Sequence, residues 1–422
     1  MKTILIILDG LGDRPQQELD NKTPLEYAKT PNLDKIAGMG INGLYHPLSL
    51  GICPSSEIAH FRIFGYDLYD FPGRGIIEAS GEGIPFDNND VLCLAHFADV
   101  EERNGHLYLK RDRSSLTHEE CKRLTSLVGN FQFNGICLRF HHTRKTEGIL
   151  VLTGDVSHEI TDSDPMFEGL PIIKVQPYEN AGDRQRAETT SEALNRYIRW
   201  VYNHIDGKAG RVTIITQRPG RKKSILPFDK KYGMKGLSIA SSPLYWGLAR
   251  EIGLSCKKVK DSDSADRDLR ERLIIARDSL SEFDFIHVHT KRTDTAAHTR
   301  MPVNKVRTIE DIDRAMGFAL DEFIDRDDII MIVGSDHSTP SSGALIHSGE
   351  PVPVVICGNG IRVDDVDAFG ERPVSKGGLG HIYGSDIMNM ILNITDRGKL
   401  AGLMSTPIDL PYYPGDIEPF EL

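Results

Sequence analysis

The feature that most constrains the fold is a short, continuously apolar run that recurs along the chain and ends each time in polar or glycine-containing residues. Residues 2–8 form the first such run, and similar runs return at 283–289, 328–333 and 352–357. Continuous apolar runs of this length are typical of strands buried on both faces. Helical patterns such as that of 307–323 separate them. This alternation predicts an α/β core whose mainly parallel sheet is flanked by helices.

The middle of the chain follows a different pattern. Strand-like runs such as 91–97 are mixed there with a helical pattern over 190–204, and basic residues are frequent. A chain of 422 residues is also long enough for more than one domain. We therefore expect a smaller α+β domain at 86–229, inserted into a discontinuous core formed by 1–85 and 230–422.

Charge and composition exclude several classes of protein. The chain has 50 Lys and Arg against 61 Asp and Glu, a net charge of −11, which argues against a nucleic-acid-binding protein. The sequence contains no apolar run of membrane-spanning length, and the first run reaches Asp9 too early for a signal peptide. The six cysteines form no CxxC pair, as is usual in a reducing compartment. We expect a cytoplasmic protein without nucleic-acid or membrane partners.

Metal-binding side chains follow the predicted strands in five short segments. These segments supply three carboxylates, three imidazoles and a serine: Asp9, Asp294, Asp336, His298, His337, His347 and Ser56. Taken singly, a strand-end aspartate is more often a helix cap, and an Asp-x-x-x-His pair can be a surface pair on a helix. The ordered set at strand ends favours two divalent ions that share one site and leave room for substrate oxygens.

Several longer motifs resemble a known family. They include LDGLGDRP at 8–15, KTPLEYAKTPNLDKIA at 22–37, GRGIIEASGEGI at 73–84 and HSGEPVPVVICG at 347–358. The chain resembles, almost from end to end, the archaeal type of cofactor-independent phosphoglycerate mutase, in the alkaline phosphatase superfamily. This resemblance implies an alkaline-phosphatase-like core. It also implies interconversion of 3-phosphoglycerate and 2-phosphoglycerate, in glycolysis and gluconeogenesis, without 2,3-bisphosphoglycerate as cofactor.

The resemblance also implies roles for single residues. Ser56 would be the nucleophile and would form a phosphoserine intermediate. Manganese or magnesium would be the usual metal, although mixed Asp and His ligation also admits zinc or cobalt. The implied ligands are Asp294, His298 and His347 for one ion, and Asp9, Asp336, His337 and the Ser56 oxygen for the other. The chemistry is sound on physical grounds, because coordination to a divalent cation activates a serine hydroxyl that is a weak nucleophile at neutral pH.

A mutase must also hold the dephosphorylated glycerate and keep water from the phosphoserine. Cationic side chains are needed for this task, and guanidinium groups suit carboxylate and phosphate oxygens. By resemblance or by their place in the basic middle region, the substrate-binding candidates are Arg218, Arg221, Lys235, Arg111, Arg113 and Arg144. Each of them could instead be a solvated surface residue.

Other readings stay open from the sequence. Ser55 and His381 stand where the family usually has Gly and Arg, so the substrate is less certain than the chemistry. A phosphomonoesterase or a phosphonate-handling relative could use the same serine and two metals. A metal-binding regulatory protein without activity is a third reading, which the intact nucleophile and ligands disfavour. Asp162 and Asp164 could be acid–base partners or turn residues, and the sequence assigns no role to Glu57 or His60 and predicts no oligomeric state.

Overall fold

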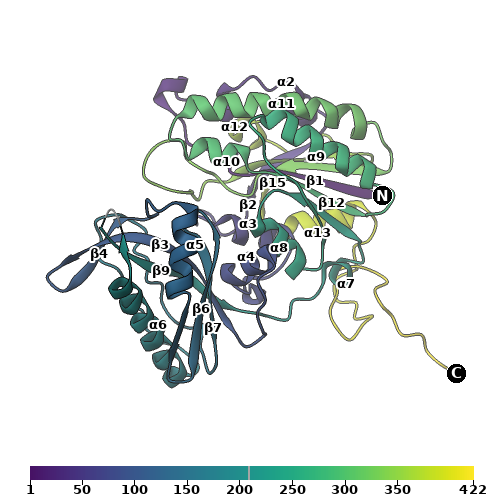
Figure 1. The fold of residues 1–422 in the computed structure, drawn as a ribbon. Coiled ribbons are helices and arrows are strands. Elements are labelled where there is room, and N and C mark those ends of the chain that lie inside the picture. Colours follow the sequence, from purple (N-terminus) through teal and green to yellow (C-terminus); the bar gives the residue numbers. More distant parts are fainter. Residues whose placement is uncertain (208–209) are drawn as a thin grey trace. The chain divides into compact units, whose positions relative to one another are not determined.

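The chain forms two compact units in the computed structural model, which describes residues 1–207 and 210–422 (Figure 1). The core unit comprises Met1–Phe71 and Ile225–Leu422, and the inserted unit comprises Pro72–Ser224. Each unit has its own sheet. The domain boundaries that the sequence suggested, at 86 and 229, stay predictions.

The core unit is built on an eight-stranded sheet with the order β11-β10-β12-β1-β13-β14-β2-β15. Every neighbouring pair is parallel except the two pairs that include β14. The predicted mainly parallel sheet is therefore confirmed. The strands are β1 (Lys2–Leu8), β2 (Gly40–His46), β10 (Gly236–Ala240), β11 (Ser255–Lys258), β12 (Phe285–Thr290), β13 (Ile329–Gly334), β14 (Val352–Gly358) and β15 (Gly380–Tyr383).

Strand β14 is antiparallel because of the connection that precedes it. Parallel neighbours need a crossover, usually a helix, whereas antiparallel neighbours can be joined by a loop. No helix lies between β13 and β14, and the described link, 335–351, returns along the same edge of the sheet. This link carries Asp336, His337 and His347.

Helices cover both faces of this sheet, as an α/β fold requires. Alternate side chains of β1, namely Ile4, Ile6 and Leu8, belong to one apolar core with buried residues of α9 and α11, and Figure 1 shows α3, α8 and α13 on the other face. The helices of the core unit are α1 (Pro24–Tyr27), α2 (Pro31–Ala37), α3 (Ser56–Ile63), α7 (Phe228–Tyr232), α8 (Pro243–Glu251), α9 (Ala265–Ser279), α10 (Arg292–Ala297), α11 (Pro302–Phe323), α12 (Glu371–Val374) and α13 (Asp386–Ile394), with 3-10 turns η1 (Gln17–Leu19) and η2 (Leu68–Asp70).

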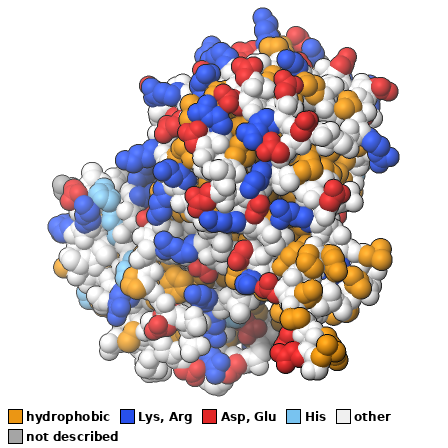
Figure 2. Space-filling model, turned by 90° about the vertical axis from the view of Figure 1, so that its right-hand side faces the viewer, with side chains coloured by type: hydrophobic (Ala, Val, Ile, Leu, Met, Phe, Trp, Pro, Cys, Tyr) orange, Lys and Arg blue, Asp and Glu red, His pale blue; other side chains and the backbone are white. Residues whose placement is uncertain are grey.

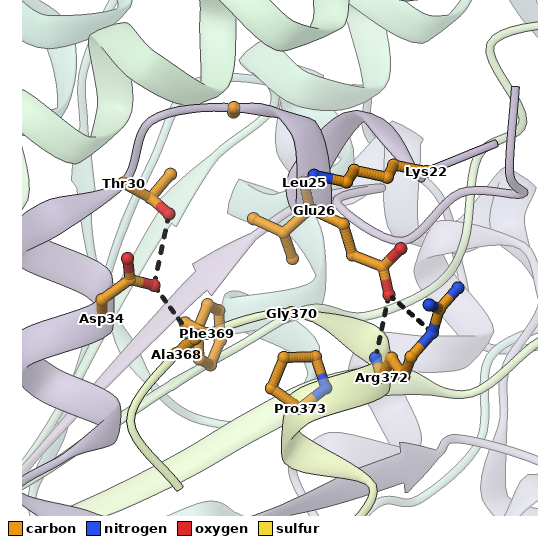
Figure 3. A pocket seen from close by; sticks show the side chains of 11 residues that line it. Lys22, Leu25, Glu26, Thr30, Asp34, Ala368, Phe369, Gly370, Arg372 and Pro373 are labelled. Carbon is orange, nitrogen blue, oxygen red and sulfur yellow. Dashed lines mark hydrogen bonds and ion pairs between the residues drawn. The ribbon is translucent and has the colours of Figure 1, made fainter. Parts of the chain in front are cut away.

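One of the junctions between the two sequence-distant parts of the core unit lies where the segment 368–373 meets α1 and α2 (Figure 3). The Phe369 N–H donates to Asp34 Oδ1 at 2.9 Å, and the Arg372 N–H donates to Glu26 Oε1 at 3.2 Å. A cavity of about 240 Å³ lies at this junction. None of the site residues predicted from the sequence lines it.

The inserted unit has a seven-stranded sheet whose described pairs are all antiparallel. Alternation along β3 directs Val91, Cys93 and Phe97 toward the core shared with α5 and α6, and Leu92 toward α4. The elements are α4 (Arg74–Glu82), β3 (Val91–Arg103), β4 (His106–Arg111), α5 (His118–Val128), β5 (Asn130–Phe133), β6 (Ile136–Arg144), β7 (Glu147–Thr153), α6 (Arg184–His204), β8 (Asp206–Gly207) and β9 (Gly210–Arg221).

The surface carries both signs of charge. Figure 2 shows Lys and Arg interspersed with Asp and Glu, and hydrophobic side chains gathered at the lower right of the view. Large apolar side chains are exposed in the C-terminal segment, among them Leu400, Met404, Ile408 and Phe420. Across the described residues, no helix combines the length and apolar character needed to cross a bilayer. All six cysteines are free thiols.

Candidate metal centre

The metal-binding side chains gather at the edge of the sheet where its parallel strands end. Strands β12, β1 and β13 are adjacent and parallel, so their carboxyl ends lie side by side. Asp9 directly follows β1, Asp294 lies in α10 just after β12, and Asp336 follows β13. This edge is the usual place for a ligand site in an open α/β sheet.

Asp294 is the centre of the first group of ligands. Its Oδ1 lies 3.2 Å from His298 Nε2 and 3.5 Å from His347 Nε2. Helical spacing explains the first contact, because residues four apart share a helix face. The second comes from the β13–β14 link, where His347 Nδ1 bonds the Pro54 carbonyl at 2.9 Å, which fixes the ring and leaves Nε2 toward Asp294.

His337 is the centre of the second group. Its Nε2 lies 3.4 Å from Asp9 Oδ1, 3.2 Å from Asp336 Oδ2 and 3.0 Å from Ser56 Oγ. Ligand atoms of Asp9, Asp294 and His337 all lie within 4.8 Å of one another, as do those of Asp294 with His298 and His347. Asp294 therefore lies within reach of both groups.

The arrangement fits divalent cations on chemical grounds. Asp9 Oδ1, Asp294 Oδ2 and Asp336 Oδ2 are buried and accept no hydrogen bond within the described chain, and their neighbours are cationic or imidazole groups such as Lys291 Nζ, 3.4 Å from Asp294 Oδ2. Buried carboxylate oxygens of this kind are costly unless a cation or a donor faces them. The six predicted ligands converge on one place. Their carboxylate oxygens and imidazole nitrogens form a donor set that suits divalent metals.

The electrostatics keep Asp9, Asp294 and His337 in the forms that bind metal, whereas the hydrogen bond to Asp294 outweighs burial and raises the pKa of His347. Burial acts to raise the pKa of Asp294, but hydrogen bonds from His298 and His347 outweigh it and hold that pKa well below its usual range. Burial likewise acts to raise the pKa of Asp9. The charge of Lys291 and the hydrogen bond from His289 outweigh burial, so that pKa is lowered. Burial lowers the pKa of His337. Ionised carboxylates and neutral imidazole are the forms that coordinate a cation.

Several side chains that sequence reasoning missed hold the ligands in place. Asp9 Oδ2 accepts hydrogen bonds from the Tyr245 hydroxyl and from His289 Nε2, the latter at 2.9 Å. Thr339 Oγ1 donates to Asp294 Oδ1 at 2.9 Å. His60, whose role the sequence left open, places Nδ1 3.3 Å from Asp336 Oδ2. His289 had a detectable signal, since a histidine inside an otherwise apolar strand needs a polar partner.

A buried lysine ties together two of the loops that carry the ligands. Lys305 Nζ donates to the Gly12 and Thr339 carbonyls, each at 2.8 Å, and lies 3.1 Å from Asp13 Oδ2. Both members of the ion pair are fully buried. A buried charge needs such complete pairing. The loops after β1 and β13 are thus fastened to α11 next to the metal ligands.

Each predicted substrate cation has an ionic or hydrogen-bonded neighbour within its own unit. Lys235 precedes β10, so it lies at the amino end of the parallel strands, opposite to the metal ligands, and it pairs with Glu282 at 2.8 Å. The sequence motif alone could not show at which edge of the sheet Lys235 lies, and its substrate contact stays a prediction. In the inserted unit, Arg144 Nε lies 2.6 Å from Glu147 Oε2, and exposed Arg111 lies 3.9 Å from Asp99.

Three further candidates of the inserted unit have neighbours of their own. The Arg218 N–H donates to Asp162 Oδ1 at 2.6 Å, in a backbone conformation with φ of 53°. The Arg221 guanidinium donates to the Val156 carbonyl. Burial lowers the pKa of Arg221 from its ordinary value. The Arg113 guanidinium contacts His96 Nε2 and the Asp112 carboxylate. Asp162 and Asp164 accept backbone hydrogen bonds, as turn residues do.

The comparisons with known proteins agree with this geometry. Residues 1–394 match the family model of the metalloenzyme superfamily. The chain is 38% identical to 2,3-bisphosphoglycerate-independent phosphoglycerate mutase 2 of Methanocaldococcus jannaschii, over 99% of both chains. It is 34% identical to 2,3-bisphosphoglycerate-independent phosphoglycerate mutase of Pyrococcus horikoshii, over 95% of this chain and 98% of that protein.

Solved structures of two archaeal proteins are similar as well. The cofactor-independent phosphoglycerate mutase of Thermoplasma acidophilum has a TM-score of 0.63 and 31% identity, over 94% of this chain and 100% of that one. A Pyrococcus horikoshii protein has a TM-score of 0.76 and 29% identity, over 95% of this chain and 99% of that one.

Proposed function

Because the chain belongs to the metalloenzyme superfamily and, within it, to the 2,3-bisphosphoglycerate-independent phosphoglycerate mutases, we propose that it interconverts 3-phosphoglycerate and 2-phosphoglycerate through a phosphoserine at Ser56. The observation that carries this proposal is the convergence of Asp9, Asp294 and His337 within 4.8 Å, with Ser56 Oγ 3.0 Å from His337 Nε2. The serine thus lies beside a group of buried carboxylate oxygens that fits cations.

The surroundings of Ser56 suit a nucleophile. It is the first residue of α3 and is buried, and Ser55 occupies the N-cap position. The partial positive charge at a helix N-terminus favours an oxyanion and a phosphate group there. The six ligands would hold two divalent ions, for which we propose manganese or magnesium, and bound ions would lower the pKa of the hydroxyl and neutralise phosphoryl oxygens.

The reaction would proceed as two phosphoryl transfers. In the first, a bond forms between Ser56 Oγ and phosphorus while the bond from phosphorus to the substrate oxygen breaks. In the second, the other hydroxyl of the retained glycerate takes the phosphoryl group from Ser56. The Arg218 and Arg221 guanidinium groups are our candidates for retaining the glycerate, since charge-assisted bonds to carboxylates are strong. We also place the enzyme in the cytoplasm, a choice supported by its six free cysteines.

The decisive experiment follows the fate of phosphate. The manganese-loaded enzyme is incubated with 3-phosphoglycerate, without 2,3-bisphosphoglycerate, and phosphorus NMR monitors the products. The mutase proposal expects 2-phosphoglycerate to approach equilibrium with little inorganic phosphate. Release of inorganic phosphate as the main product would instead identify a phosphatase. Ser56→Ala serves as the control, since it retains the ligands of both ions except the serine oxygen.

A further inference from the structure

A second group of metal-binding side chains lies in the inserted unit, apart from the residues of the candidate metal centre. His96 lies in β3, Asp112 directly follows β4, and Asp164 lies in the segment between β7 and α6. One ligand atom from each of them lies within 4.8 Å of the others. His96 Nε2 is 3.1 Å from Asp112 Oδ1 and 3.8 Å from Asp164 Oδ2. We call these three residues the His96 cluster.

The fold of the inserted unit positions the His96 cluster firmly. Alternation along β3 directs Ala95 and Phe97 into the core beneath α5 and α6, so His96 points to the opposite face. The side chains of His96 and Asp164 are 4% and 0% exposed, whereas that of Asp112 is 37% exposed. Two ligands are therefore fixed inside the unit, and the third is partly exposed, so an ion can reach it from solvent.

Asp164 is oriented by its own hydrogen bonds. Its Oδ1 accepts from the Met166 N–H at 2.7 Å, and its Oδ2 accepts from Gln217 Nε2. Each carboxylate oxygen has a further lone pair. Bonds of this kind hold the carboxylate plane without occupying all of its acceptor capacity, as outer hydrogen bonds do around metal ligands.

The Arg113 guanidinium bridges two ligand atoms of the His96 cluster. Arg113 Nη1 lies 2.7 Å from His96 Nε2 and 2.8 Å from Asp112 Oδ1. An imidazole nitrogen carries either a proton or a lone pair, so Nε2 can donate to Asp112 or accept from Arg113, but not both. The atoms of the cluster are thus acceptors that converge on one point, and the Arg113 guanidinium supplies positive charge there.

We propose that the His96 cluster binds a divalent metal ion of the zinc, manganese or cobalt class, separate from the ions of the core unit. Metal–ligand bonds of about 2.0–2.2 Å place neighbouring ligand atoms roughly 3.0–3.5 Å apart. The distances from His96 Nε2 to Asp112 Oδ1 and to Asp164 Oδ2, 3.1 and 3.8 Å, lie near this range. One imidazole and two carboxylates form a mixed donor set that such ions accept.

Arg113 has room to leave when an ion binds. A cavity of about 460 Å³ borders it and is lined by Thr117, His118 and Glu147 among others. Arg113 Nε already lies 3.7 Å from Glu147 Oε1, so the guanidinium can turn toward that carboxylate and keep an ionic partner. The ion would then take the place of the guanidinium between Asp112 and His96, while Arg113 stays in the unit beside Glu147.

The test counts bound ions on the full chain by elemental analysis after dialysis against zinc, and measures their affinity by calorimetry. His96→Ala should bind one ion fewer than the natural protein. Asp112→Asn should lower the affinity for one ion by about tenfold or more. His141→Ala, a half-buried histidine of β6 outside the cluster, is the matched control and should keep the full number.

Arg113→Gln should change the metal affinity in the opposite direction, because it removes the guanidinium that competes with the ion for the same acceptors. The affinity of that one ion should rise by about tenfold. The proposal is overturned if Asp112→Asn and His96→Ala bind as many ions as the natural protein with unchanged affinity, or if Arg113→Gln binds more weakly. Asp112 is partly exposed, so its variant keeps the test usable if His96→Ala fails to fold. The result does not depend on mutase activity.

Discussion

At the scale of single residues, two adjacent serines differ in what surrounds their hydroxyls. Ser56 Oγ lies 3.0 Å from His337 Nε2, whereas Ser55 is the N-cap of α3 and makes no side-chain capping bond. We expect Ser56→Ala to abolish the phosphoprotein found by mass spectrometry after turnover is quenched. Ser55→Ala should retain it, and activity should fall by less than about tenfold. A phosphorylated Ser56→Ala protein would show that the nucleophile lies elsewhere.

Glu371 gives a prediction for the pH dependence of stability. Its carboxylate accepts from Thr23 Oγ1 at 2.8 Å and from the Asp13 N–H at 3.2 Å. Burial raises the pKa of Glu371 from 4.5 to about 7. Between these two values the folded chain holds a proton that the unfolded chain has released. The free energy of unfolding should therefore decrease by an amount on the order of 3 kcal/mol as pH rises from about 4.5 to about 7, and it should stay level above pH 7.

Urea unfolding at several pH values, compared with Glu371→Gln, checks this expectation. Glutamine does not titrate, so the variant should lose this part of the slope. Glu282→Gln is the control, because Glu282 pairs with Lys235 on the surface, and it should keep the slope of the natural protein. Parallel curves for the natural protein and Glu371→Gln would contradict the assignment.

At the scale of elements, the loop after β1 approaches α10 so closely that only glycine fits. Gly10 has a φ of 65°, and a Cβ placed there would collide with Thr339 Oγ1 and lie 2.8 Å from Asp294 Cβ. The Asp294 N–H also donates to the Asp9 carbonyl at 2.9 Å. Gly10→Ala should displace Asp294, which lies within reach of both ligand groups, and weaken manganese binding by about tenfold or more.

The backbone strain of Gly10→Ala can be separated from the collision. Gly83, at the end of α4, has a φ of 76° and no atom within 4 Å of the added Cβ. Gly83→Ala should therefore lower the free energy of unfolding by only the cost of a left-handed alanine, about 1–2 kcal/mol, and it should bind manganese with unchanged affinity. Calorimetry on both variants makes the comparison, and equal manganese affinities would show that the close approach is unimportant.

At the scale of the whole molecule, we expect the core unit to bind the metals and the inserted unit to hold the glycerate. All six predicted ligands belong to the core unit, whereas Arg218 and Arg221 belong to the inserted unit. We expect Arg218→Ala and Arg221→Ala to form phosphoserine but to release more inorganic phosphate relative to 2-phosphoglycerate. Loss of one charge-assisted contact costs about 1.5–3 kcal/mol, or roughly ten- to a hundredfold in rate. An unchanged product ratio and rate would mean that the glycerate is held by other residues.

Much of this molecule could be predicted from sequence because the signals are local. Apolar runs and helical spacing located four core strands, β1, β12, β13 and β14, and the helix α11. Helix α11 begins five residues before the predicted 307, at Pro302, a favoured residue for a first turn. Strand-end position likewise predicted which aspartates and histidines would meet. The resemblance to a family added the identity of Ser56 and the substrate, which spacing alone could not supply.

Other features were decided only by the tertiary structure, because they depend on contacts between residues far apart in the chain. The position of Asp294 within reach of two ligand groups, the bond from Tyr245 to Asp9 and the placement of Lys235 at the far edge of the sheet are of this kind. The sequence by itself determines where strands end and which donor atoms stand there. The order and direction of the strands decide which of those atoms meet, since only neighbouring parallel ends share an edge.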